Sequence, residues 1–145
     1  MPTYMLIMRA TDKGLAASLS GDFEAIINAM GAFNEAMIDA GVMVGGDGLS
    51  DPSEGFVVDF STPDLAVTDG PYGPTEALFN GYWTIRVADR DEAISWARRC
   101  PMGPGQKLEV RRVTDESDFA DFADNEYIQK EAGWRDALGS DAADS

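Results

Sequence analysis

Histidine is missing from this chain of 145 residues, and cysteine occurs once, at Cys100. Without histidine, the chain lacks the commonest general base near neutral pH and the commonest metal ligand. A single cysteine excludes an internal disulfide bond and fits a reducing compartment, so we expect a cytoplasmic protein. The first residues show no basic segment followed by an apolar one, which predicts that there is no signal peptide.

Long apolar runs and basic residues are also scarce. No run approaches the roughly 18 apolar residues of a membrane-spanning helix, so we expect no contact with a membrane. The 11 lysines and arginines face 26 aspartates and glutamates, which gives a net charge of −15. A phosphate backbone is repelled by such a surface, and we predict no nucleic-acid partner. The acids lack the spacing of a calcium-binding loop, and we predict neither a metal nor a cofactor.

Apolar patterns divide the chain into strands and helices. Apolar residues at spacings of three and four predict a helix from Phe23 that ends at a left-handed cap, Gly41, and Asp89 starts a second helix. The segment Thr11–Gly21 mixes small and polar residues and is interpreted as a loop. Short apolar runs predict strands over Thr3–Arg9, Val42–Val44, Phe56–Phe60, Leu65–Thr68, Gly81–Val87 and Lys107–Val113.

Glycines and turn residues refine this pattern. Three glycines within Gly45–Gly48 indicate a bulge or a close approach of another backbone. The turn signal Ser61–Asp64 lies between two β-prone runs and predicts a hairpin. The element order is a β-α-β-β-α-β plan with this extra hairpin, which predicts an α+β fold with an antiparallel sheet and both helices on one face. The other sheet face then has to meet a ligand, a tail or a second subunit.

The composition changes after residue 113. Residues 114–145 hold ten acids and two bases, together with aromatic residues such as Phe119, Phe122 and Trp134. Disordered tails are poor in aromatics. We therefore predict a domain over residues 1–113 and an acidic C-terminal extension over residues 114–145, which contains one or two short docked helices and is disordered over Ser140–Ser145.

The turn at Asp69 is the best candidate for chemistry. Gly70 supplies a permissive backbone and Pro71 fixes the next φ, so the chain turns sharply and holds the Asp69 carboxylate at a rigid corner beside Tyr72. A fixed carboxylate can act as a general base or anchor a ligand, and Asp69 is the candidate catalytic residue. Alternatively, Asp69 accepts hydrogen bonds from the N–H groups of its own turn.

Two arginines are candidates for binding a substrate. Arg9 follows the apolar part of the first strand and Arg111 lies on the last strand. If these strands are neighbours, both guanidinium groups can point into one cleft and suit a carboxylate or phenolate ligand. The alternative is an internal ion pair with Asp69 or Glu109.

Aromatic residues near the turn are further candidates. Tyr72 and Trp83 can form a wall for a flat ligand, although rings on strands more often belong to a core or a dimer interface. Tyr82 and Trp83 point to opposite faces, so at most one of them lines a given cleft. Cys100 follows two arginines at a helix end and is interpreted as structural.

These residues together resemble the YCII-related family, in particular its DGPF-domain branch. The resemblance covers residues 3–113 and implies a ferredoxin-like fold that dimerises sheet to sheet into a dimeric α/β barrel. Most members have no assigned role; one looser relative is a dehydrochlorinase, and DGPF-type proteins occur with extracytoplasmic-function sigma factors. The matching segments are Tyr4–Ile7, Gly41–Val42, Gly46–Leu49, Val67–Tyr72, Glu76, Gly81–Trp83, Asp91–Ala93, Trp96–Ala97, Cys100–Pro101 and Leu108–Arg111.

The chain departs from that family in three ways. Tyr72 stands where the branch usually has phenylalanine, and the extension past Val113 has no counterpart. The wider family often carries a His–Asp pair in its cleft, which a chain without histidine cannot form. Catalysis then requires a carboxylate with a raised pKa, so the sequence leaves open whether the protein is an enzyme.

Two functions fit the sequence. In the first, a homodimer binds a small anionic or aromatic molecule in a cleft near Asp69, where it is anchored or transformed. In the second, the chain is a non-catalytic regulatory or interaction module, whose acidic C-terminal extension presents aromatic anchors to a protein partner. The resemblance links this second function to sigma-factor signalling.

Overall fold

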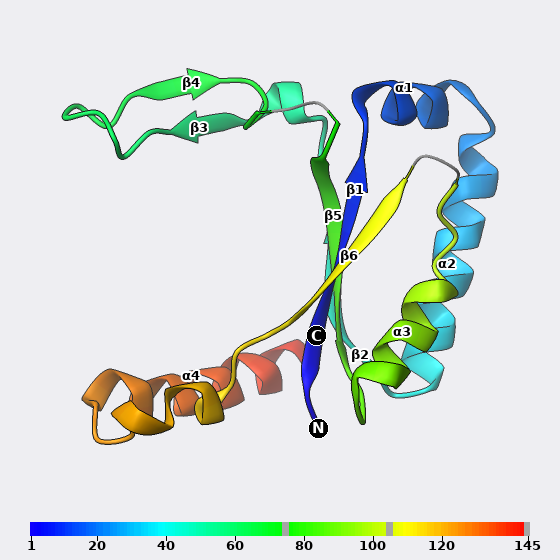
Figure 1. Cartoon of the computed structure of the whole chain (residues 1–145). Helices are drawn as coiled ribbons and strands as arrows, with labels where there is room; N and C mark the ends of the chain where they lie inside the picture. Colours follow the sequence, from blue (N-terminus) through cyan, green and yellow to red (C-terminus); the bar gives the residue numbers. More distant parts are fainter. Residues whose placement is uncertain (74–75, 104–105, 144–145) are drawn as a thin grey trace. The chain divides into compact units, whose positions relative to one another are not determined.

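The computed structural model describes residues 1–73, 76–103 and 106–143. The chain forms two units, Met1–Arg112 and Val113–Ser145 (Figure 1). No helix in the described part of the chain is long and apolar enough to cross a membrane. The elements of the first unit are, in order, β1 (Thr3–Ala10), α1 (Asp12–Ser20), α2 (Phe23–Asp39), β2 (Met43–Gly48), the 3-10 helix η1 (Pro52–Glu54), β3 (Phe56–Val58), β4 (Val67–Asp69), β5 (Leu78–Arg86), α3 (Arg90–Arg98) and β6 (Lys107–Arg112).

Four strands form the main antiparallel sheet, in the order β2-β5-β1-β6. Strands β1 and β2 run parallel with β5 between them, and β5 and β6 run parallel with β1 between them. Each helical crossover therefore joins two parallel strands across one intervening strand. The predicted α+β fold with an antiparallel sheet is confirmed. Helices α2 and α3 cover the same sheet face, and α1 lies on that side of the sheet, at its end (Figure 1).

The hydrophobic core lies between that face and the helices. Phe33 of α2 meets Trp83 of β5 edge to face, with ring centroids 5.2 Å apart. Each large apolar side chain buried here contributes about 1.5–3 kcal/mol relative to exposure. The core consists of Leu6, Phe33, Met37, Val42, Trp83, Ile85, Val87, Ala93 and Trp96.

Helix α2 begins and ends where the sequence predicts. The Asp22 carboxylate accepts a hydrogen bond from the Ala25 N–H at 3.0 Å, and Gly41 has a φ of +72° at the other end. The predicted apolar face is wider than the buried one, because the sheet covers only part of the helix. Phe33 and Met37 are buried, whereas three apolar side chains beside them are exposed: Phe23, Ile27 and Ile38.

The segment predicted as a loop over Thr11–Gly21 is a helix, α1, so that prediction is wrong. Thr11 caps the helix, because its hydroxyl accepts a hydrogen bond from the Gly14 N–H at 2.9 Å. The following Leu15-Ala16-Ala17 has high helix propensity, which offsets the cost of Gly14. Small residues give only a weak apolar pattern, and for that reason the periodicity did not reveal the helix.

Strand β2 contains both features predicted from its glycines. The register against β5 shifts between Met43 and Gly45, which is a bulge. Gly46 lies so close to β5 that a Cβ there would be 2.8 Å from the carbonyl oxygen of Tyr82. The strand continues through this segment to Gly48 and is not interrupted by it.

Strands β3 and β4 form the predicted hairpin as a separate two-stranded sheet. They are shorter than predicted, three residues each. Figure 1 shows the hairpin leaving the end of the main sheet on the side away from the helices. Strand β5 begins at Leu78, three residues earlier than predicted, and thereby adds Phe79 to the sheet.

Helix α3 starts at the predicted cap. The Asp89 carboxylate accepts the Glu92 N–H at 2.9 Å, while the Glu92 carboxylate reaches back to the Ala88 N–H at 2.6 Å. The helix ends at Arg98, before Pro101. Residues 104 and 105, which follow Pro101, lie outside the described residues.

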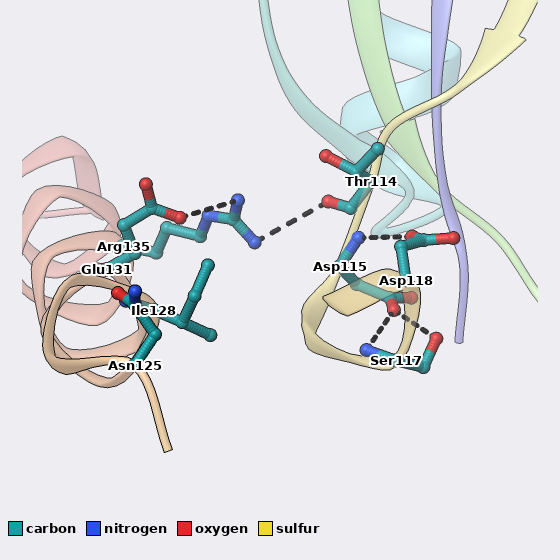
Figure 2. A network of polar contacts seen from close by, with 8 residues as sticks. All are labelled: Thr114, Asp115, Ser117, Asp118, Asn125, Ile128, Glu131 and Arg135. Atoms are coloured by element: carbon teal, nitrogen blue, oxygen red, sulfur yellow. Dashed lines mark hydrogen bonds and ion pairs between the residues drawn. The ribbon is translucent and has the colours of Figure 1, made fainter. Parts of the chain in front are cut away.

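The second unit contains η2 (Glu116–Phe122) and α4 (Glu126–Ala143). Asp115 caps η2 in a reciprocal box with Asp118: its carboxylate accepts the Asp118 N–H, and its own N–H donates to the Asp118 carboxylate at 2.8 Å. The Asp115 carboxylate also accepts the Ser117 N–H. Arg135 of α4 donates to the Thr114 carbonyl at 3.5 Å (Figure 2). Helix α4 is longer than predicted and includes residues 140–143, which were expected to be disordered; residues 144 and 145 lie outside the described residues.

Candidate functional site

The hairpin and the end of the main sheet enclose an open cleft of about 880 Å³. Its wall is mainly apolar and aromatic, and Arg9 is its only charged lining residue among the described residues. Such a cleft, with few polar groups on apolar walls, is typical of small-molecule sites. The lining comprises Arg9, Pro52, Gly55–Val58, Gly70–Gly73 and Ala77–Phe79.

Arg9 is held in place by three different groups. Its Nε and Nη2 donate to one oxygen of Glu109 at 3.1 and 3.0 Å, and its Nη1 donates to the Ala77 carbonyl at 3.1 Å. The guanidinium carbon lies 5.4 Å from the centre of the Phe79 ring. A guanidinium group has five N–H donors, so about two remain for a ligand. The internal ion pair with Glu109 left open by the sequence is therefore present, and Arg9 also faces the cleft.

Asp69 stands at the end of β4, directly opposite Phe56. Gly70 has a φ of +109°, and its N–H donates to the Gly55 carbonyl at 2.8 Å, so the turn is as tight as predicted. None of the hydrogen bonds within the described residues uses the Asp69 carboxylate, which is exposed to solvent. The carboxylate is thus not occupied in capping its own turn. It lies beside the cleft, whose lining begins at the next residue, Gly70.

The other three candidates lie in different places. Tyr72 lines the cleft and is 89 % exposed. Trp83 is on the helix-covered sheet face, 5 % exposed, and its indole N–H donates to the Asn34 side chain at 2.7 Å. Arg111 pairs with Met5 in the sheet register and does not line the cleft. The structure therefore brings Arg9 and Tyr72 together at the cleft and does not bring Trp83 or Arg111 there.

A family model described as YCII-related domain matches residues 3–117. The chain belongs to the YCII-related family. The match covers the first unit except for its first two residues, and it includes the first residues of the second unit. A search of curated proteins finds no match.

The cleft of this YCII-related chain contains residues that the sequence did not single out. Phe79 supports the guanidinium group, and Phe56 adds an apolar wall from the hairpin. The position of Phe79 next to Leu78 could have revealed the earlier start of β5. The role of Phe56 depends on the placement of the hairpin, for which the sequence carries no signal.

Tyr82 and Asp47 form a second polar contact on the sheet face that the helices leave open. The Tyr82 hydroxyl donates to the Asp47 carboxylate at 3.0 Å. This hydrogen bond, followed by the negative charge of Asp47, raises the pKa of Tyr82. Tyr82 therefore stays protonated at neutral pH and acts as a donor, whereas Trp83 faces the other way, as the strand alternation predicted.

Metal binding and thiol chemistry have little support in the described residues of the YCII-related domain. Among the described residues, no group of three or more acidic or cysteine side chains is arranged to hold a metal ion. Burial raises the pKa of the Cys100 thiol to about 11, so the thiolate is not populated at neutral pH. Cys100 packs against the hydrophobic core, which agrees with its structural interpretation.

Proposed function

We propose that this YCII-related protein, a member of the DGPF-domain branch, binds a small aromatic anion in the cleft between the hairpin and the main sheet. The main support for this proposal is the position of the Arg9 guanidinium group. Glu109 and Ala77 hold it over the Phe79 ring at the wall of an apolar cleft. A carboxylate or phenolate group would take the remaining guanidinium donors. The ring of the ligand would lie against Phe56, Tyr72 and Phe79.

Asp69 serves in this proposal as the anchoring or proton-accepting group. Its carboxylate is free of internal hydrogen bonds among the described residues and sits on a turn of restricted backbone. A phenol or an acidic C–H of the ligand would present it with a proton. An enzymatic step at this residue would be acid–base chemistry by a carboxylate alone, because no histidine is available.

The same proposal includes a homodimer. Within the first unit, the helices cover one face of the main sheet (Figure 1). The register places Met5 and Tyr82 on the other face, together with Ile7, which is buried. Two copies that turned these faces toward each other would form a dimeric α/β barrel, with the cleft at its mouth. A cytoplasmic location accompanies this proposal.

Calorimetric titration tests the ligand. Phenylacetate should bind more tightly than benzyl alcohol, which has a similar ring without the charge. Because the chain carries a charge of −15, added salt should screen the long-range repulsion and strengthen phenylacetate binding. Phenols and keto acids extend the series.

Three variants locate the site. Arg9→Gln should lower phenylacetate affinity at least about tenfold, as expected for a charge-assisted hydrogen bond, whereas the matched variant Arg98→Gln on α3 should bind like wild type. Asp69→Asn should weaken binding or abolish turnover with little change in melting temperature. Equal affinity of the wild type and Arg9→Gln for every anion would sink the proposal.

A second function is supported by a separate observation. In the second unit the rings of Phe122, Tyr127 and Trp134 are exposed among many acids. Exposed aromatics within a charged surface suit a docking segment for a protein partner, such as a component of sigma-factor signalling. If this function holds, deletion of residues 114–145 removes the partner in a pull-down and leaves the first unit stable.

A further inference from the structure

Positive and negative charges are segregated along this chain. Between residues 14 and 85 there is no lysine or arginine, although that segment contains many acids. The hairpin arm, defined as residues 51–73, belongs to this stretch. It carries five acids and no base: Asp51, Glu54, Asp59, Asp64 and Asp69.

The hairpin arm also exposes more apolar side chain than a free hairpin tolerates. Phe56 is 67 % exposed, Phe60 79 % and Val67 62 %. Phe56 pairs with Asp69, and Val58 pairs with Val67, so these four side chains share one face of the arm. A two-stranded sheet with an uncovered apolar face is marginally stable by itself. We therefore expect this face of the arm to be covered by a surface that is both apolar and positively charged.

The open sheet face, the face of the main sheet that the helices of the first unit leave uncovered, has the complementary composition. In the sheet register Arg86 stands opposite Thr3, Arg111 opposite Met5, and Lys107 opposite Arg9. Directly paired residues share a face, so all three cations lie on the open sheet face together with Arg9. Within the described residues, Arg86, Lys107 and Arg111 form no ion pair. Met5 and Ile7 are the apolar residues at the centre of this face; Met5 is partly exposed, whereas Ile7 is only 4 % exposed.

The two surfaces also lie at the same side of the first unit. The cleft lined by Arg9 and the hairpin shows that the arm rises beside the open sheet face, at the Arg9 end of the sheet. Arg86 and Arg111 lie toward the opposite end, because β1 separates Arg9 from Thr3 by six residues. An arm cannot cover that end of its own sheet without leaving the cleft.

We propose that the hairpin arm docks on the open sheet face of a second copy of this chain, at its Arg86–Arg111 end. A twofold axis perpendicular to the strands places the arm of each copy over that end of the other, so the contact occurs twice and closes the dimer. The apolar face of the arm meets Met5, and its acids meet the unpaired arginines. Asp69 of one copy then lies near cations of the other, and each copy completes the surroundings of its partner's cleft.

This inference rests on the homodimer proposed above but not on its ligand. Long-range charge favours this pairing over a contact between two hairpin arms, because each arm carries five acids and no base. A charged contact between arm and face should weaken as salt screens it, so the dimer dissociation constant should rise with salt concentration. A purely apolar sheet-to-sheet contact would be unaffected or strengthened by salt.

Charge reversal separates the two surfaces. The arm variant is Glu54→Lys/Asp64→Lys, since Asp51 and Asp59 accept hydrogen bonds from Ser53 and Ser61 that shape the arm. The face variant is Arg86→Glu/Arg111→Glu. The control variant, Glu35→Lys/Arg98→Glu, changes exposed residues of α2 and α3 on the opposite side of the sheet. Circular dichroism verifies that each variant is folded.

Sedimentation velocity on the full chain gives the result. Wild type and control should be dimers, and each reversed variant alone should show a dimer dissociation constant raised at least about 100-fold. A 1:1 mixture of the arm and face variants should recover dimers, because each reversed arm then meets a reversed face. Phenylacetate titration of the monomeric variants tests the ligand site independently.

Four outcomes would overturn the inference. These are a monomeric wild type, dimers of unchanged strength in the arm variant, dimers of unchanged strength in the face variant, and a mixture that stays monomeric. If a variant fails to fold, the salt dependence of the wild-type dissociation constant decides: no weakening between low and high salt contradicts the charged contact.

Discussion

Arg9 and Glu109 are joined across adjacent strands through a single carboxylate oxygen, which accepts from Nε at 3.1 Å and from Nη2 at 3.0 Å. Glu109 stands opposite Ile7 in the register, so the contact runs diagonally over β1 and β6. The pair therefore orients the guanidinium group toward Ala77 and the cleft. The pair matters more for positioning the guanidinium group than for the free energy of unfolding, because both side chains are about one-third exposed and solvent weakens their attraction.

The stability of this pair can be measured with a double-mutant cycle. Arg9→Ala, Glu109→Ala and the double variant should give a coupling free energy of about 0.2–1 kcal/mol in urea unfolding, and high salt should reduce it. Lys107→Ala, which removes an unpaired cation from the same face, should show no coupling to Glu109→Ala beyond error. A coupling of several kcal/mol would contradict the view that the pair is mainly a positioning device.

Gly46 should tolerate no side chain. A Cβ at this position would be 2.8 Å from the Tyr82 carbonyl oxygen and 3.0 Å from Cδ1 of Trp83. Gly46→Ala should therefore lower the free energy of unfolding by about 1–3 kcal/mol, the usual cost of overpacking. Gly45→Ala is the matched control one residue away, since its Cβ would meet nothing within 4 Å. Equal stability of the two variants would show that β2 and β5 separate more readily than this contact implies.

Asn34 should stabilise the fold through one hydrogen bond. Its side-chain oxygen accepts the Trp83 indole N–H at 2.7 Å, and Trp83 is almost fully buried. Asn34→Ala leaves that N–H without a partner and should cost about 1–3 kcal/mol in chemical denaturation. The comparison is Asn34→Ala in a Trp83→Phe background, where no N–H remains. If Asn34→Ala costs the same in both backgrounds, the hydrogen bond is not the cause.

We predict that the protein becomes less stable in alkali because of the Cys100 thiol. Burial raises its pKa from 9.0 to about 11, so the folded protein holds the thiol proton more tightly than the unfolded chain does. This contribution is complete below about pH 9 and disappears as the pH rises through about 11. Urea unfolding of the wild type should weaken over that window more than that of Cys100→Ala, which has no thiol to titrate. Parallel curves for the two proteins would refute a buried thiol.

The alternation of side chains along strands and the capping of helices could be predicted from the sequence. The opposite orientations of Tyr82 and Trp83 follow from the two-residue period of a strand, and the caps Asp22 and Asp89 are local interactions. The hairpin and the glycine bulge in β2 were likewise predicted, because turn residues act over a few positions. Helix α1 was missed because a run of small residues gives no periodic apolar signal.

The candidate site could be predicted from the sequence only in part. The tight turn at Gly70 follows from glycine and proline, but the absence of an internal partner for Asp69 depends on where the neighbouring groups lie. Arg9 and Arg111 were both placed on strands correctly, yet the register sets them four residues apart along the β1–β6 ladder. Only one of them can then reach the cleft, and no pattern in the sequence reports that register.

The sequence alone determined the α+β class, the acidic character and the order of elements, because apolar periodicity, charge and turn chemistry act over short stretches of chain. The tertiary structure decided what those elements place together: Arg9 over Phe79, the hairpin beside the open sheet face, and the unpaired cations on that face. Those relationships join residues up to about 100 positions apart, as Arg9 and Glu109 are. They depend on packing and register across the whole first unit, which short stretches of chain do not encode.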